Sequence, residues 1–135
     1  MGTTLEIASA VLDAIVAEAA GSPVEICGLL FGDDARIVER RRCRNVAAEP
    51  AVAFEIDPAA LLAAHRAMRR GGLRLVGCYH SHPSGTPEPS ARDAAAAAPD
   101  GWFWLIATTR AVGAWRAVER GQQHGRFDPV AIERV

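Results

Sequence analysis

The sequence predicts an α/β domain built around one central sheet. Helical segments with one apolar face alternate along the chain with short apolar runs that end at turn signals, which is typical of such domains. The chain has 135 residues, 50% of them hydrophobic, which suits one buried core and argues against disorder. We find no internal repeat and no linker, so residues 1–135 are predicted to form a single domain.

Three helices are predicted from periodicity and end signals. The first begins at its cap Ser9, keeps its apolar residues on one arc, and ends at the "GSP" turn. The second spans 57–72, opens with the cap Asp57 followed by a proline, and closes on two glycines. The third is the short stretch 90–98, which is stopped by a proline.

The remaining apolar runs are predicted as strands. Most are nearly continuous in apolar residues, as in buried strands, whereas one mixes β-branched residues with arginines and is expected to be more exposed. In chain order the predicted strands cover residues 25–32, 35–46, 73–80, 101–109, 112–120 and 127–135.

Charge and cysteine usage exclude several classes of protein. The formal net charge of −1 argues against a nucleic-acid partner bound through phosphates. Cys27, Cys43 and Cys78 form no CxxC pair and make an odd number, which disfavours a disulfide framework and suits a reducing cytoplasm. No apolar run approaches membrane-spanning length, and the N-terminus lacks the pattern of a signal peptide. We therefore expect a soluble cytoplasmic protein with no membrane partner.

The stretch "YHSHPSGTPEPSARD", residues 79–93, concentrates metal-ligand chemistry. His80 and His82 are two residues apart at a strand end, so both rings can point to one side. Ser90 and Asp93 are three apart at a helix start and share one face. Two imidazoles and one carboxylate are the usual ligands of a catalytic zinc, with water in the fourth position.

A hydrolase of this kind also needs a base that is not a ligand and a donor for the developing oxyanion. Glu25 directly precedes a buried strand and would be rigidly placed, whereas Glu88 lies between prolines in a loop. Ser90 could donate its hydroxyl to the oxyanion, a role worth roughly 3 kcal/mol.

At these residues the sequence resembles the JAMM (MPN+) metalloprotease family. The family signature is a distant Glu, then H-x-H, seven residues, S, two residues and D, and "EICGLLFG", "GCYHSHP" and "PSARD" match it. The resemblance covers essentially the whole chain and is of the compact prokaryotic type. It implies that His80, His82 and Asp93 bind zinc, that Glu25 is the acid/base, and that Ser90 stabilises the oxyanion.

The resemblance also implies a fold and a substrate class. The fold is a curved mixed β-sheet flanked by helices, similar to the cytidine-deaminase architecture, although the deaminase pattern H-x-E…P-C-x-x-C is absent. Family members cut peptide or isopeptide bonds beside the C-terminal diglycine of ubiquitin-like proteins. Compact members resemble processing peptidases for sulfur-carrier proteins, so such a carrier tail is the expected partner. The sequence leaves a homodimer open.

Several of these residues have simpler interpretations. "SARD" is also a helix capping box, which is compatible with a metal role. His65 is expected to pack beside its helix rather than bind metal, and Cys78 to be a small buried residue rather than a ligand. Four arginines could attract an acidic carrier, but a solvated strand face is favoured: Arg40, Arg41, Arg42 and Arg44.

Two other functions stay open at this point. A non-catalytic scaffold of the same family would typically lack the ligand set, which is intact here. A metal-dependent hydrolase of small amides would use the same site with a narrower pocket. Cleavage of a diglycine-tailed protein, compared with small amides, separates these from the peptidase.

Overall fold

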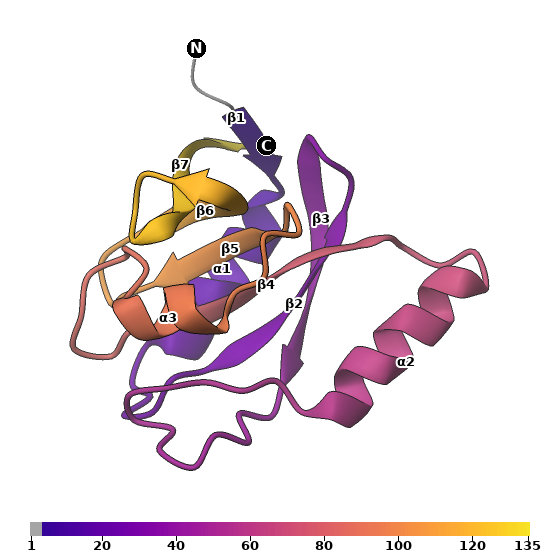
Figure 1. Ribbon diagram of the computed structural model, residues 1–135. Coiled ribbons are helices and arrows are strands. Elements are labelled where there is room, and N and C mark those ends of the chain that lie inside the picture. Colours follow the sequence, from indigo (N-terminus) through magenta and orange to yellow (C-terminus); the bar gives the residue numbers. More distant parts are fainter. Residues whose placement is uncertain (1–3) are drawn as a thin grey trace.

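The computed structural model describes residues 4–135, which contain seven strands and three helices (Figure 1). Every strand and helix expected from the sequence is present, with ends displaced by a few residues. The elements in chain order are β1 (Thr4–Ile7), α1 (Ser9–Ala19), β2 (Cys27–Gly32), β3 (Arg36–Cys43), α2 (Pro58–Arg69), β4 (Leu75–Ser81), α3 (Ala91–Ala96), β5 (Phe103–Ala107), β6 (Val112–Gly121) and β7 (Gly125–Arg134).

The strands form one mixed sheet that curves until it closes on itself. The order around the barrel is β1-β3-β2-β4-β5-β6-β7, and β7 pairs with β1 to complete it. Three neighbouring pairs are parallel, namely β1 with β3, β1 with β7, and β4 with β5. The expected curved mixed sheet is therefore confirmed, and its curvature is complete.

The closing strand β1 was not among the predicted elements. It is four residues long, with Leu5 and Ile7 fully buried while Thr4 is exposed. This alternation is that of a half-buried strand. Four residues are too few, however, to establish a period of two in the sequence and to distinguish the strand from a loop that leads into the helix.

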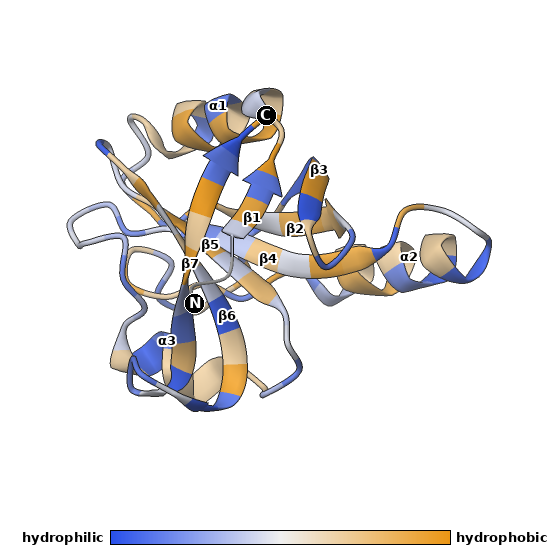
Figure 2. Cartoon of the chain, turned by 90° about the horizontal axis from the view of Figure 1, so that it is seen from above, coloured by the Kyte–Doolittle hydropathy of each residue, from blue (hydrophilic) through white to orange (hydrophobic). Residues whose placement is uncertain are grey.

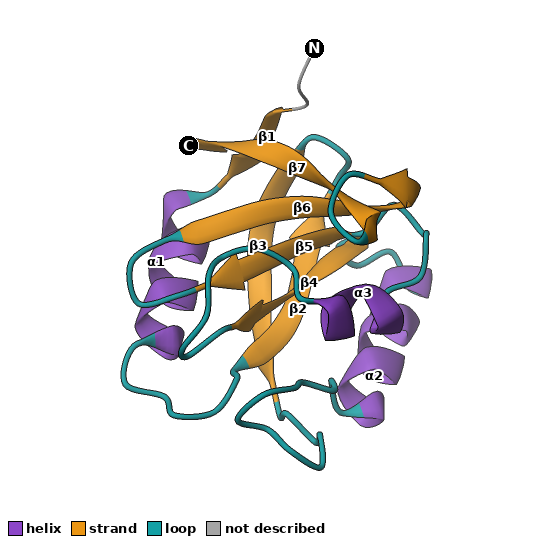
Figure 3. Ribbon diagram, turned by 60° about the vertical axis from the view of Figure 1, so that its left-hand side comes forward, coloured by secondary structure: helices purple, strands orange, loops and turns teal. Residues whose placement is uncertain are grey.

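The helices cover opposite sides of the sheet (Figure 3), with α1 on one side and α2 and α3 on the other. The predicted cap Asp57 is confirmed, because its carboxylate accepts the Ala59 N–H at 3.0 Å. The predicted cap Ser9 is wrong: Ala8 occupies the cap position and provides no side-chain hydrogen bond. Ser9 is instead the first helical residue.

Three apolar clusters hold these layers together. The largest joins α1 to all seven strands and includes the buried Tyr79. A second packs α2 against β2 and β4 around Ala64, the one buried residue of that helix. The third packs α3 against β4 to β7 and contains Cys78 and Trp104. Along the strands, apolar and polar residues form alternating bands that are visible on β7 in Figure 2.

None of the helices in residues 4–135 is long and apolar enough to cross a membrane.

Candidate metal centre

The site lies where β4 ends. All seven residues of β4 are buried, and the strand is flanked by β2 and the parallel strand β5. His80 is the second-last residue of β4 and is fully buried, and His82 follows just beyond the end of the strand. Their ring centroids are 4.9 Å apart, so both imidazoles face one side, as the two-residue spacing predicts.

Three side-chain atoms converge on one point. His80 Nε2 and His82 Nε2 are 3.1 Å apart, and Asp93 Oδ2 lies 3.2 Å and 3.1 Å from them. In a tetrahedral zinc site with bonds of about 2.0–2.1 Å, ligand atoms are about 3.3 Å apart. The donors therefore form a near-equilateral face of the size that such an ion requires, and two nitrogens with one oxygen are the donor types it takes.

The protonation of His82 is set by a neighbour. Its Nδ1 donates to the Thr86 carbonyl at 2.7 Å, since a carbonyl can only accept. In a neutral ring the lone pair is then on Nε2, the atom that faces His80 and Asp93. Burial lowers the pKa of His82, but the hydrogen bonds to Asp93 and Thr86 outweigh it and leave that pKa raised.

Asp93 reaches the site because of how α3 begins. Ser90 Oγ accepts the Asp93 N–H, and Asp93 Oδ2 accepts the Ser90 N–H, each at 3.0 Å. This is the predicted capping box, and it orients the carboxylate. Burial would raise the pKa of Asp93, but hydrogen bonds from both histidines outweigh it and hold the pKa well below its usual range.

Ser90 has a free proton in this arrangement. Its oxygen is the acceptor of the capping bond, so its hydroxyl hydrogen is available to a second group. The side chain lies on the wall of a hollow of about 210 Å³ that Glu25 and His82 also line.

Glu25 stands beside the two histidines, and its side chain has no hydrogen bond to either among the described residues. One donor atom from each of Glu25, His80 and His82 lies within 4.8 Å of the others. The side chain is 5% exposed, and Oε1 has no hydrogen-bond partner among the described residues. Burial raises the pKa of its carboxyl from 4.5 to about 7. A buried carboxyl with an unsatisfied oxygen, next to the converging donors, is suited to exchange a proton with a water between them.

The loop between the two pairs of residues is held down by β6. Trp115 Nε1 donates to the Pro87 carbonyl at 2.9 Å, and a Cβ at Gly113 would overlap the same oxygen. Because only glycine allows this approach, the loop can lie flat and carry α3 back over the end of β4.

The structure also adds a residue that the sequence did not single out. The Phe54 ring stacks on the His80 imidazole with centroids 4.2 Å apart and planes 18° apart. Phe54 comes from the segment between β3 and α2, and no local pattern marks it.

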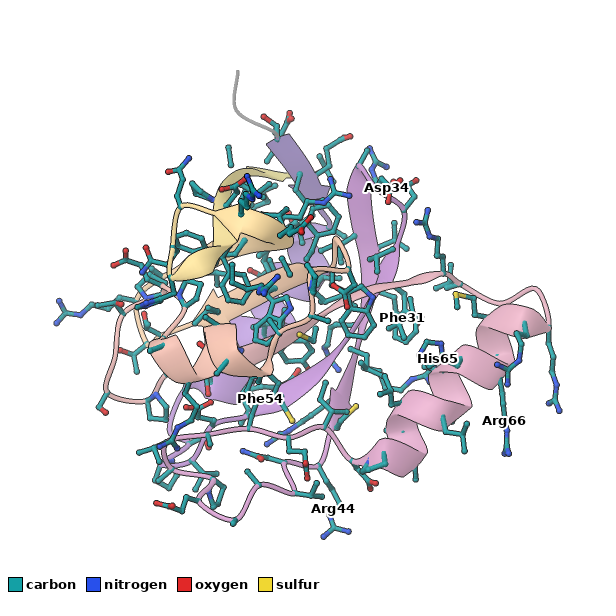
Figure 4. The ribbon with its side chains drawn as sticks, in the orientation of Figure 1. Phe31, Asp34, Arg44, Phe54, His65 and Arg66 are labelled. Atoms are coloured by element: carbon teal, nitrogen blue, oxygen red, sulfur yellow. The ribbon has the colours of Figure 1, made fainter. Side chains whose placement is uncertain are left out.

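His65, Cys78 and the arginines, for which simpler interpretations are favoured, lie outside the site. His65 is partly buried on the side of α2 that faces the sheet, whereas Arg66 and Arg44 point into solvent (Figure 4). Cys78 is buried in the apolar cluster beside α3, and burial raises the pKa of its thiol well above the usual range. Of the four arginines that could attract an acidic carrier, Arg40 and Arg42 form ion pairs with Glu18. The Arg41 guanidinium lies over the Phe31 ring.

A curved α/β sheet that presents two imidazoles, a carboxylate and a separate buried glutamate around the end of one strand has the arrangement of a class, the single-metal hydrolases. Within that class, residues 8–121 match the family described as prokaryotic homologs of the JAB domain, and the chain belongs to this family. The predicted family is thereby confirmed.

Individual relatives agree with this assignment. The chain is 43% identical over 109 residues to the desampylase of Haloferax volcanii, a match covering 76% of this chain and 78% of that one. It is 40% identical over 91 residues to the desampylase of Pyrococcus furiosus, covering 67% and 64% of the two chains. A shorter match, 51% over 49 residues and 33% of its length, is with a probable TtuB-protein conjugate cleaving protease of Thermus thermophilus.

Solved structures support the fold. A protein of Desulfitobacterium hafniense superimposes with a TM-score of 0.78 at 25% identity, over 97% of this chain and 92% of the other. A JAB1/MPN domain protein from Archaeoglobus fulgidus has the same fold, with a TM-score of 0.58 at 18% identity over 98% and 100% of the chains.

Proposed function

We propose that this protein is a zinc-dependent isopeptidase that hydrolyses the amide bond at the C-terminal diglycine of a ubiquitin-like protein. The observation that carries the proposal is the set of three converging donor atoms with a buried, unpaired glutamate oxygen beside them. The relatives named desampylase and conjugate-cleaving protease supply the substrate class. A sulfur-carrier protein as the particular partner stays a prediction.

In this proposal His80, His82 and Asp93 hold the cation. Zinc is the proposed ion because two neutral imidazoles and one carboxylate in a compact triangle match its preferred ligands. When bound, the ion supplies hydroxide near neutral pH and polarises the scissile carbonyl.

Glu25 and Ser90 carry out the proton and charge handling. Burial raises the pKa of the Glu25 carboxyl to about 7 in the metal-free protein, and a cation held nearby would favour its ionised form, so the carboxylate can take a proton from the attacking water and return it to the departing amine nitrogen. Ser90, whose oxygen is occupied by the Asp93 N–H, can donate its hydroxyl hydrogen to the oxyanion that forms at the carbonyl.

Domain extent and location are proposed on related grounds. The family match reaches residue 121, and the pairing of β7 with β1 ties the described ends of the chain into one sheet, which supports a single domain over residues 1–135.

The free cysteines Cys27, Cys43 and Cys78 support a cytoplasmic location.

The test separates metal binding from turnover. Glu25→Gln should keep the metal, measured by elemental analysis after dialysis, and lose at least about 100-fold in the rate of cleaving a diglycine-linked conjugate. His82→Ala should lose both turnover and the metal, because two donors hold a cation much more weakly than three.

Matched variants serve as controls. Glu88→Gln removes an exposed carboxylate and His65→Ala an off-site imidazole, and both should behave like the parent. If Glu25→Gln cleaves as fast as the parent, the assigned acid/base is wrong. If the parent binds metal but cleaves only small amides, the proposed substrate class is wrong. If it cleaves neither conjugates nor small amides, the result favours the non-catalytic scaffold function.

A further inference from the structure

The single asparagine of the sequence, Asn45, lies just beyond the end of β3 with every hydrogen-bonding position of its side chain occupied. Nδ2 donates to the Glu25 carbonyl at 2.8 Å and to the Ala53 carbonyl at 3.0 Å. Oδ1 accepts the Ala47 N–H at 3.0 Å and the Glu55 N–H at 3.1 Å. Because both partners of Nδ2 are acceptors and both partners of Oδ1 are donors, only an amide in this orientation satisfies all four.

The first of these bonds holds the backbone of Glu25. The Glu25 carbonyl is held by Asn45, and its N–H donates to the Pro50 carbonyl at 2.7 Å. The Glu25 Oε1 atom has no hydrogen-bond partner among the described residues. The position of this carboxyl group is therefore set largely by its backbone, and that backbone is held on both sides by the segment that Asn45 anchors.

Two of the other bonds hold the backbone on either side of Phe54. Asn45 binds the carbonyl of Ala53 and the N–H of Glu55, which are the residues on either side of Phe54. The Phe54 ring in turn covers the His80 imidazole at 4.2 Å. One side chain is thus hydrogen-bonded both to the backbone of Glu25 and to the two residues that flank Phe54.

We propose that Asn45 is the positioning residue that holds Glu25 at its working distance from the histidines, with Phe54 as the second arm of the same clamp. The inference rests on the proposed function of the site. Asn45 contacts no reacting group itself, so its effect is on the rate of the chemical step rather than on metal binding.

Asn45→Ala and Asn45→Asp test this in the full-length, metal-loaded protein. Asn45→Ala removes all four bonds. Asn45→Asp keeps the bonds accepted from the Ala47 and Glu55 N–H groups but sets a carboxylate oxygen against the Glu25 and Ala53 carbonyls, so it breaks the bond to Glu25 while one of the two bonds beside Phe54 remains. We expect kcat on the conjugate to fall by about 100-fold in both, as for a misplacement of about 1 Å, with KM and metal content near those of the parent.

A double-variant comparison separates positioning from general destabilisation. If Asn45 acts through Glu25, Glu25→Gln and Glu25→Gln/Asn45→Asp should have the same residual kcat, because the second change has nothing left to misplace. Asp57→Ala is the matched control: it removes a cap at the end of the same segment without contacting Glu25 or Phe54 and should keep the parent's kcat. Additive losses in the double variant, or equal losses in Asp57→Ala, would overturn the proposal.

Amide hydrogen exchange gives a readout that does not depend on activity. In metal-free protein the Glu25 N–H should exchange faster in both Asn45 variants, while Glu55 N–H protection should be lost in Asn45→Ala and kept in Asn45→Asp. Unchanged exchange at Glu25 would refute the clamp even if the parent cleaved no conjugate. Faster exchange at Glu25 in the Asn45 variants, combined with a parent that cleaves no conjugate, would refute the proposed function and leave the clamp standing.

Discussion

Burial of a single carboxyl group has consequences for stability as well as for chemistry. Glu25 is 5% exposed, and burial raises its pKa from 4.5 to about 7 against the opposing charge of His82, while Asp93 adds a smaller increase and Arg92 a smaller decrease. The protonated form is therefore favoured in the folded, metal-free protein below about pH 7. A cation bound nearby would favour the ionised form and offset this cost.

The stability of the metal-free protein should therefore depend on pH through Glu25. Its folded-state pKa lies above the unfolded value, so the stability it contributes is complete below pH 4.5 and is lost as the pH rises through 7. Relative to Glu25→Gln, the parent should lose up to about 3 kcal/mol of unfolding free energy across that window. Urea unfolding of both proteins from pH 4 to pH 8 measures this, and parallel curves would contradict it.

The helix α3 is six residues long, and its start serves the site directly. The same Ser90 hydroxyl caps the helix and faces the hollow shared with Glu25 and His82. Capping and catalysis are compatible here because the cap uses the oxygen as an acceptor and leaves the hydrogen free. The two roles differ in what their loss should do.

Ser90→Ala should lower unfolding free energy by about 1 kcal/mol through loss of the cap. It should also lower kcat by about 100-fold or more through loss of the oxyanion donor. Ser90→Thr keeps a hydroxyl and should recover much of both. The Asp57→Ala cap variant of α2 gives the stability loss alone, so a Ser90→Ala enzyme no slower than Asp57→Ala would leave Ser90 with a capping role only.

Closure of the barrel brings the two ends of the described chain together. β1 pairs with β3 on one side and with β7 on the other, with Leu5 opposite Ile132. The same closed sheet sets the relative positions of β2, which follows Glu25, and β4, which carries His80. A strand far from the site in sequence thus contributes to the rigidity on which the site depends.

Leu5→Ala should lower the unfolding free energy by about 2–5 kcal/mol, because Leu5 is fully buried in the cluster that joins α1 to the sheet. Denaturant unfolding of the metal-free protein measures it, with the exposed Thr4→Ala as the control. The folded fraction of Leu5→Ala should still bind metal. A loss below about 0.5 kcal/mol would show that β1 is not part of the cooperative core.

The sequence by itself determined whatever depends on short-range geometry. The spacing of His80 and His82 along a strand, the cap at Asp57 and the Ser90–Asp93 box are set within a few residues, so each could be predicted and each is present. Glu25 was predicted from the chemistry that the site requires together with family resemblance, because no local signal links it to residues 55 or more positions away.

Tertiary structure decided the rest. The closing strand β1, the stacking of Phe54 on His80 and the clamp made by Asn45 all depend on contacts between segments that only the folded sheet brings together. An asparagine at a strand end looks the same in sequence whether its amide faces water or four backbone groups. The physical reason is that hydrogen-bond partners and packing surfaces are chosen in space, whereas sequence patterns record only what lies along one element.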